Sequence, residues 1–141
     1  YYNGDTKFTP IHCSDLTDII LEVVQKELTS EIIECGGPQI ITFKEIISIL
    51  MKLIDKKRIL LPMPLMGGKL IAKIMEFMPK PLLTTDQLNL LKYDNIYSNN
   101  YKTNSSINVP SKRIFENEVK KYCYMWREGG QFSTEKYLDK D

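Results

Sequence analysis

The chain has 141 residues, of which 43% are hydrophobic and 26% charged, and its formal net charge at pH 7 is +1. This length and composition predict a single globular piece spanning residues 1 to 141. The near-neutral charge excludes nucleic acid as the main partner, because binding to phosphates requires a clear excess of cations.

The cysteines and the start of the sequence indicate which cellular compartment to expect. Cys13, Cys35 and Cys123 are far apart and odd in number. They lack the paired spacing of zinc or redox motifs, and a single histidine adds little, so we predict free thiols in a reducing compartment and no metal site. The sequence opens on Tyr1 in the middle of a pattern, with no charged-then-apolar leader. We therefore expect a fragment of a longer protein and a cytoplasmic location.

The strongest pattern lies at residues 8–24. Residues 8–11 predict a short strand that breaks at His12. A helix is expected next, capped by Ser14 or Asp15, because apolar residues then recur with helical spacing. These are Leu16, Ile19, Ile20, Val23 and Val24. Ligands of α/β proteins often bind at such a strand-to-helix corner.

A second strand and helix follow. Residues 31–35 predict a strand closed by a turn at Gly36, Gly37 and Pro38, and the glycines of a phosphate-binding loop are absent. Thr42 and Glu45 predict a capping box for a helix that ends near residue 55. The cations at 56–58 suit the negative end of that helix, and the alternative is that they bind an anionic substrate or lipid.

Residues 65–78 form the most apolar part of the chain, after a proline-rich connector at 60–64. A helix that is apolar around most of its circumference is wrapped by other elements or rests on a membrane or a partner. Core packing is the favoured interpretation. Under the alternative, the contact surface would include Lys69, Lys73, Met75 and Phe77.

Two further helices are predicted towards the end. Thr84 and Gln87 form a second possible capping box, and the helix that they start ends near residue 93. Residues 94–108 lack periodicity and predict a long irregular connection. The last helix is expected to start at Pro110 and to end at residues 129–130.

No complete set of catalytic residues is visible. A nucleophilic triad would have to use His12 with Cys13 or Ser14, but neighbouring residues on a strand point to opposite faces. We expect His12 instead to bond the backbone or touch a ligand. Asp15 and Asp18 lie at a predicted helix start, where the helix dipole favours them without catalysis.

Three segments resemble the C-terminal half of extended short-chain dehydrogenases/reductases, proteins of the NAD-dependent epimerase/dehydratase type. They are FTPIHCSDLTDII, ECGGPQIITFKEII and LPMPL…MPKPLLTTDQLNLLKYDNI. They are similar in particular to the branch of the nucleotide-binding accessory subunits (subunit nine of the alpha subcomplex) of respiratory complex I, NADH:ubiquinone oxidoreductase. The resemblance implies an α/β fold: the C-terminal portion of a Rossmann-type protein, mostly helical with two or three short strands. The N-terminal nucleotide-binding half would be missing.

The resemblance also bears on cofactor and site. The family binds NAD(P) through a glycine-rich loop and reacts its substrates with a YxxxK pair, and neither motif occurs in residues 1–141. It therefore implies NAD(P) binding by a full-length parent and no cofactor bound by this chain alone. It further implies a substrate cleft lined by His12, at the end of the first strand, and by Asp94 and Asn95.

Two functions follow from the resemblance. The first is an accessory or assembly subunit of complex I, cytoplasmic or peripheral at the inner membrane, with complex I subunits or the membrane surface as partners. The alternative is the substrate domain of an active NAD(P)-dependent sugar-nucleotide epimerase or reductase. In either case strands at 8–11 and 32–35 would have open edges, which predicts that a missing N-terminal half or a partner chain covers them.

Overall fold

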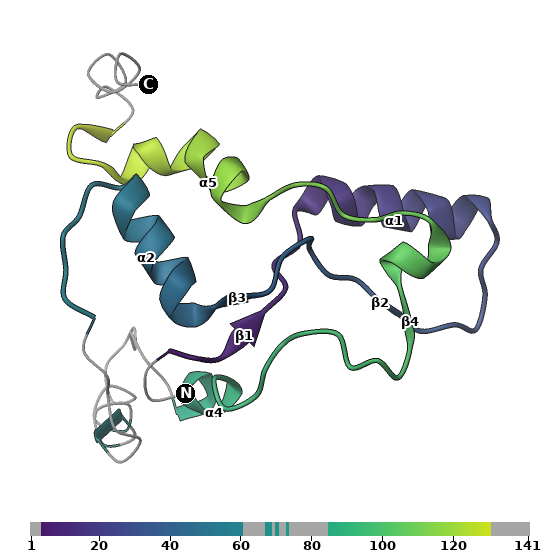
Figure 1. Cartoon of the computed structure of the whole chain (residues 1–141), viewed down its shortest axis with the longest axis horizontal. Coiled ribbons are helices and arrows are strands. Elements are labelled where there is room, and N and C mark those ends of the chain that lie inside the picture. Colours follow the sequence, from purple (N-terminus) through teal and green to yellow (C-terminus); the bar gives the residue numbers. More distant parts are fainter. Residues whose placement is uncertain (1–3, 61–66, 69, 71–72, 74–84, 131–141) are drawn as a thin grey trace.

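A computed structural model describes residues 4–60, 67–68, 70, 73 and 85–130. These residues form a mixed α/β structure of helices and very short strands (Figure 1). The elements in chain order are β1 (Lys7–Phe8), α1 (Cys13–Gln25), β2 (Ile33–Glu34), β3 (Ile41–Thr42), α2 (Phe43–Leu53), α4 (Thr85–Leu90), β4 (Lys102–Thr103), the 3-10 helix η1 (Asn104–Ile107), α5 (Phe115–Cys123) and the 3-10 helix η2 (Tyr124–Trp126).

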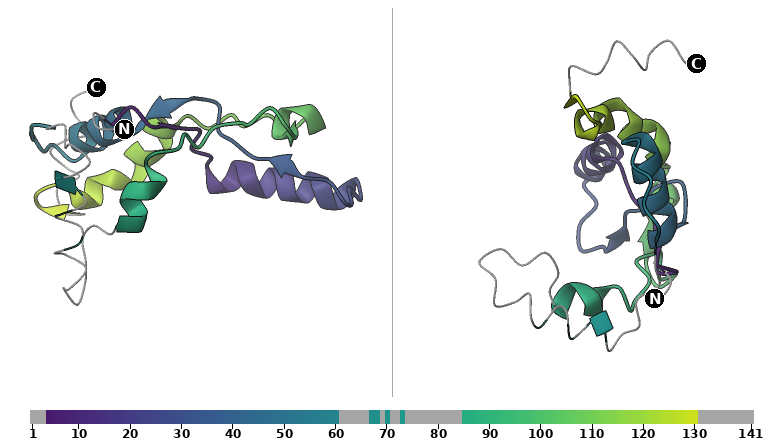
Figure 2. Two further views of the ribbon diagram at one scale, coloured as in Figure 1. Left: turned by 90° about the horizontal axis from the view of Figure 1, so that it is seen from below. Right: turned by 90° about the vertical axis from the view of Figure 1, so that its left-hand side faces the viewer.

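The elements fall into two lobes, each built on one two-stranded sheet (Figure 1). One lobe contains β1, β3, α2, α4 and α5. The other, which we call the α1 lobe, contains α1, β2, β4 and η1 and extends away from the first as a thin arm. Viewed along the long axis, the elements follow a single curved layer rather than a stack of layers (Figure 2). Much apolar surface is therefore left without a second layer among the described residues.

β1 has a neighbour on both sides. It pairs antiparallel with β3, with Lys7 opposite Thr42, and Phe8 also forms a parallel bridge with Asn95. The observed strand is shorter than the expected 8–11, and Pro10, which has no N–H to donate, lies outside it. The expected open edge is therefore not found at β1.

β2 is different, because it has one partner. Ile33 lies opposite Lys102 and Glu34 opposite Thr103, in a parallel pair with β4. No other strand in the described part of the chain pairs with the second edge of β2. The prediction that 94–108 is irregular is wrong in its second half, which contains β4 and η1. Hydrogen bonds to polar side chains order this segment, such as the bond from the Thr103 backbone N–H to Ser106 Oγ at 3.3 Å.

The main core lies between α2 and α5. Leu53, Val119 and Cys123 are buried there, and partly buried apolar residues of both helices pack around them. The helix α2 therefore turns an apolar face towards α5. A smaller core in the α1 lobe contains Ile19 and Ile107, which are 2% and 7% exposed.

The predicted capping box of α2 is confirmed. Thr42 Oγ1 accepts from the Glu45 N–H at 3.2 Å, and Glu45 Oε2 accepts from the Thr42 N–H at 2.7 Å. The hydrogen bonds from the Thr42 backbone and hydroxyl hold the pKa of Glu45 below its ordinary value.

We expect Thr42→Ala to lower the free energy of unfolding by about 1 kcal/mol, because the first turn of α2 loses its side-chain acceptor. Urea unfolding followed by circular dichroism measures this change. Ser48→Ala is the matched control, since the Ser48 hydroxyl donates to the Lys44 carbonyl within α2 and caps nothing. A loss at Ser48 equal to that at Thr42 would contradict the capping account.

Other predicted elements are shifted or lie outside the described residues. The last helix begins at Phe115 rather than Pro110, and its α-helical part ends at Cys123, before η2. Of residues 65–78, Gly67, Gly68, Leu70 and Lys73 are helical, and the others lie outside the described residues. Thr84 lies outside them too. Within the described residues, no helix is both long and apolar enough to cross a membrane.

Candidate functional site

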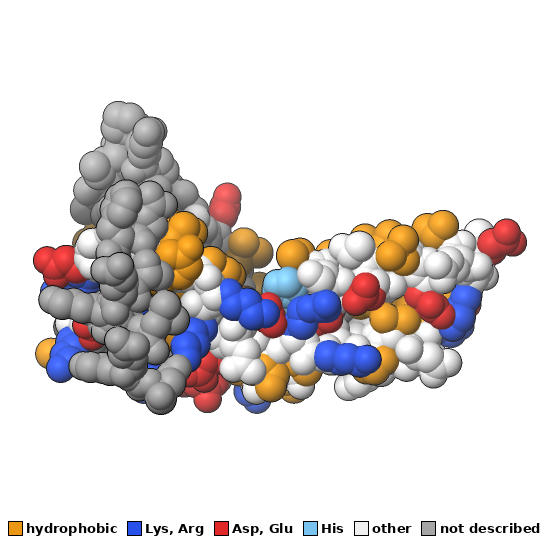
Figure 3. Space-filling model, turned by 90° about the horizontal axis from the view of Figure 1, so that it is seen from above, with side chains coloured by type: hydrophobic (Ala, Val, Ile, Leu, Met, Phe, Trp, Pro, Cys, Tyr) orange, Lys and Arg blue, Asp and Glu red, His pale blue; other side chains and the backbone are white. Residues whose placement is uncertain are grey.

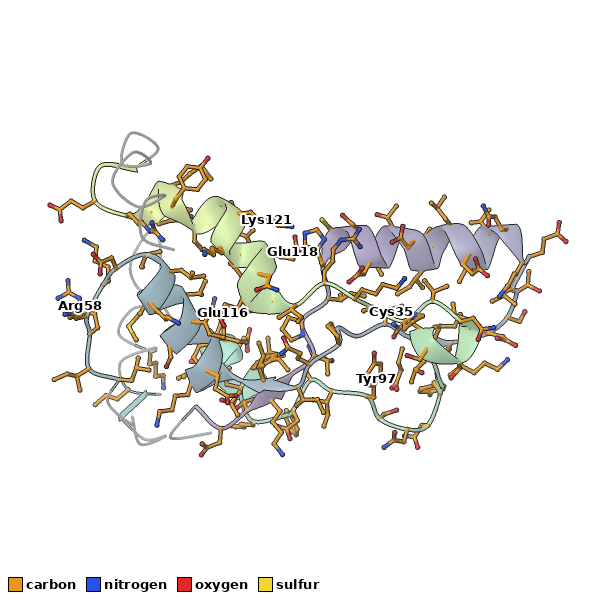
Figure 4. All side chains as sticks on the ribbon, turned by 45° about the horizontal axis from the view of Figure 1, so that its top comes forward. Cys35, Arg58, Tyr97, Glu116, Glu118 and Lys121 are labelled. Carbon is orange, nitrogen blue, oxygen red and sulfur yellow. The ribbon has the colours of Figure 1, made fainter. Side chains whose placement is uncertain are left out.

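His12 lies at the corner where α1 begins. Its Nδ1 accepts a hydrogen bond from the Ser14 N–H at 3.2 Å, so His12 caps the helix, not Ser14 or Asp15 as expected. Because Nδ1 accepts, the proton of the neutral ring belongs on Nε2. Nε2 lies 3.6 Å from Glu118 Oε2, and Figure 4 shows Glu118 on the part of α5 that approaches the start of α1. His12 thus joins the helices of the two lobes.

Glu118 also belongs to an ion pair within α5. Lys121 Nζ lies 2.6 Å from Glu118 Oε2. The hydrogen bond from Lys121 holds the pKa of Glu118 below its ordinary value, and the charges of Lys121 and Arg113 act in the same direction. Glu118 therefore stays a carboxylate that can orient the His12 ring.

Asp15 is the buried carboxylate of this region, with 5% of its surface exposed. Its Oδ2 accepts from the Lys112 N–H at 3.2 Å and from the Arg113 N–H at 3.1 Å, and its Oδ1 accepts from Arg113 Nη1. Burial alone would raise its pKa, but the hydrogen bonds from Arg113 and Lys112 outweigh burial and leave the pKa below its ordinary value. Asp15 therefore holds the extended chain before α5 against α1.

A cleft of about 400 Å³ opens beside this ion pair. It is lined by Asp15, Asp18, Asn108, Val109, Pro110, Lys112 and Arg113. Asp18 Oδ2 lies 3.5 Å from Arg113 Nη1 and is exposed. Two carboxylates balance two cations, so the cleft suits a polar molecule with donors and acceptors better than a highly charged anion.

His12, the first of the predicted cleft residues, is not among the residues that line this cleft. The roles of Asp15 and Arg113 were missed. Asp15 was assigned to the helix dipole, and its partner lies 98 residues away in the chain. The sequence did contain one indication of a buried ion pair, which is an acidic residue close to the apolar face of a predicted helix. The residues near it in the chain do not identify its partner.

Asp94 and Asn95 do not line the cleft. Asp94 Oδ1 accepts from the Lys7 N–H at 2.9 Å, and Asn95 exchanges backbone bonds with Lys7 and Thr9 at 2.8 and 3.1 Å. They hold their segment along β1. None of the three predicted cleft residues, His12, Asp94 and Asn95, therefore lines the cleft beside Asp15.

Cys13 lies closer to His12 than expected. Its Sγ is 4.0 Å from Nδ1, because Cys13 is the first residue of α1 and not a strand residue. The expectation that the two side chains point to opposite faces is thus wrong. Nδ1 is already used by the Ser14 N–H, which competes with the thiol for the same lone pair.

Most of the predicted contact surface of residues 65–78 falls outside the described part of the chain. Lys73 is exposed, whereas Lys69, Met75 and Phe77 lie outside the described residues. All three cysteines are free thiols. Across residues 4–60, 85–130 and the few helical positions between them, no group of three or more His, Cys, Asp or Glu side chains is placed to hold a metal ion.

Comparison of the chain with protein-family models and with curated proteins gives no match.

Proposed function

We propose that this chain is the C-terminal, substrate-facing part of an NAD(P)-binding protein of the short-chain dehydrogenase/reductase type, and that the whole protein is an accessory or assembly subunit of respiratory complex I. The nucleotide-binding half would lie on a different segment and would complete the Rossmann-type sheet. The bound NAD(P) would then stabilise the protein rather than react. The complex I assignment rests on the three sequence segments quoted above.

The observation that carries the proposal is the one-sided construction of the α1 lobe. Leu16, Ile20 and Val24 follow one another at four-residue spacing, and 36%, 53% and 68% of their surfaces are exposed. Figure 3 shows hydrophobic side chains along one edge of this arm. The same lobe contains β2, whose second edge has no strand partner in the described chain.

An exposed apolar helix face and an unpaired strand edge in one lobe are expected where a neighbouring part of a sheet is missing. Burying each of these side chains would contribute on the order of 1 kcal/mol, and a strand on β2 would satisfy backbone groups that are otherwise hydrated. A parallel strand fits best, because β2 already pairs in parallel with β4 and wholly parallel sheets are buried between helices. This supports a sheet-bearing partner segment.

The cleft beside Asp15 favours the second candidate function, the substrate domain of an active NAD(P)-dependent sugar-nucleotide epimerase or reductase. Its balanced carboxylates and cations offer hydrogen bonds to a polar substrate. The described residues that line the cleft include no histidine, cysteine or tyrosine, so the reacting groups would belong to the nucleotide-binding half.

The experiment is to purify the longest native species that contains this sequence, to measure its intact mass and to titrate it with NADH and NADPH. A mass well above 16.4 kDa with nucleotide binding and no turnover supports the accessory subunit. Binding with turnover of a sugar nucleotide supports the epimerase or reductase. A mass equal to that of this chain, with no nucleotide binding, overturns both.

A substitution on α1 tests the proposed contact. We expect Ile20→Ser with Val24→Ser to change the unfolding free energy of this chain alone by about 1 kcal/mol or less, because both side chains are exposed. In the longest native species the same pair should cost about 2–4 kcal/mol, since two buried apolar contacts are lost. Thermal unfolding with and without NADH measures both.

The control is Leu90→Ser with Tyr93→Ser. Leu90 is the last residue of α4 and Tyr93 follows the helix, and the two are 73% and 74% exposed. This pair should have the same small effect in both species. Equal losses of unfolding free energy for the α1 pair in the two species would show that nothing covers the α1 stripe, the exposed face formed by Leu16, Ile20 and Val24.

A further inference from the structure

We propose that the end of the molecule opposite the α1 lobe is a binding surface for an anionic lipid bilayer. The surface consists of Lys56, Lys57, Arg58 and Ile59, which follow α2, and of Met125 and Trp126 in η2. We call it the basic–aromatic surface. It does not depend on the nucleotide-binding proposal, and it lies on the other lobe from the α1 stripe.

Two distant segments form this surface because α2 and η2 are tied together. Arg127 Nε donates to the carbonyl oxygen of Leu53, the last residue of α2, at 2.6 Å. Lys56 is held just beyond that helix end by its N–H, which donates to Met51 O at 2.9 Å. Figure 1 accordingly shows the end of α2 beside the last turn that follows α5.

The apolar members of the surface are unusually accessible for their type. Ile59 is 86% exposed, Trp126 68% and Met125 48%. An indole and long aliphatic side chains are the groups that enter the boundary between lipid headgroups and acyl chains. Exposed large apolar side chains that gather at one end of a molecule often mark a contact surface.

Charge decides in favour of a lipid partner. The consecutive cations Lys56, Lys57 and Arg58 are all exposed, and Figure 4 shows Arg58 at the end of the molecule far from α1. The neighbouring acidic residues in the chain are Asp55 and Glu128, so the cations are in excess. Long basic side chains can reach phosphate groups while their stems lie along apolar neighbours.

The test is binding of the full chain to phosphatidylcholine vesicles with and without phosphatidylserine, measured by co-sedimentation. We expect binding to the anionic vesicles, weaker binding at high salt, and little binding to pure phosphatidylcholine. Lys56→Gln, Lys57→Gln and Arg58→Gln together should reduce partitioning about a hundredfold, and Trp126→Ser about tenfold. Trp126 fluorescence should shift to shorter wavelength when the anionic vesicles are added.

Matched variants separate this surface from a general charge effect. Lys7→Gln, Lys44→Gln and Lys92→Gln remove the same charge from exposed positions elsewhere and should change partitioning much less. Tyr101→Ser, next to β4, is the aromatic control. Equal losses for both triple variants, or equal binding to both kinds of vesicle, would overturn the proposal. Binding to poly-glutamate as tight as to anionic vesicles would overturn it in favour of an acidic protein partner.

Discussion

Asp15→Ala is expected to lower the free energy of unfolding by about 2–4 kcal/mol. The substitution leaves the Lys112 and Arg113 amides and the Arg113 guanidinium without the carboxylate that accepts from all of them. The chain before α5 would then lose its attachment to α1, and the lobes would be less firmly joined. Urea unfolding of the two proteins at neutral pH measures the difference.

Asp18→Ala is the matched control. Asp18 faces the same Arg113 side chain at 3.5 Å but is 57% exposed, so its removal should cost less than about 1 kcal/mol. A cost for Asp18 equal to that for Asp15 would mean that the buried hydrogen bonds of Asp15 contribute nothing beyond charge.

The same ion pair gives a pH dependence with a defined sign. The pKa of Asp15 in the folded chain is below its ordinary value of 3.8. Its contribution to stability is therefore fully present above that ordinary value and is lost as the pH falls through the lowered pKa. Asp15→Asn should flatten the acid limb of the stability curve, and an unchanged acid limb in that variant would contradict this role.

Gly37→Ala is expected to cost about 3 kcal/mol or more, because the new methyl group would meet backbone that has no room to move. Its Cβ would lie 2.7 Å from the carbonyl carbon of Pro10 and closer still to the oxygen. The Gly37 N–H donates to Thr9 O at 3.1 Å, so the end of β2 is fixed directly against the chain that follows β1. Thermal unfolding measures the loss.

Gly36→Ala provides the comparison. A Cβ at this position would meet the far end of the Tyr97 ring at 2.6 Å, and a side chain can turn aside where a backbone carbonyl cannot. We expect a smaller cost of about 1–2 kcal/mol, including strain on the Tyr97 hydroxyl bond to Asn104. A Gly36 variant as unstable as the Gly37 variant would show that the close approach to Pro10 is not the limiting contact.

The helices could be predicted because their signals are local. The Thr42 and Glu45 box lies within four residues and was found with its correct partners. The apolar spacing of α1 likewise gave its position, although the expected cap was two or three residues too late. Periodicity and capping depend on neighbours in the chain, so one sequence contains the information.

The contacts that position the cleft could not be predicted in this way. Asp15 and Arg113 meet across 98 residues, and β2 pairs with β4 through a segment without periodicity. The late start of α5 has the same origin, because the Lys112 and Arg113 amides donate to Asp15 instead of opening a helix. The pattern at Leu16, Ile20 and Val24 identified an apolar face correctly, but not that it stays exposed in this chain.

The most direct test of the account is amide hydrogen exchange over α1 and residues 31–36, in this chain alone and in the longest native species that contains it. If a nucleotide-binding half covers the α1 stripe and the free edge of β2, exchange there should slow by about tenfold or more in the longer species. Exchange over β1 should stay the same, since β1 already has a neighbour on both sides. Equal exchange of α1 and residues 31–36 in both species would contradict the account.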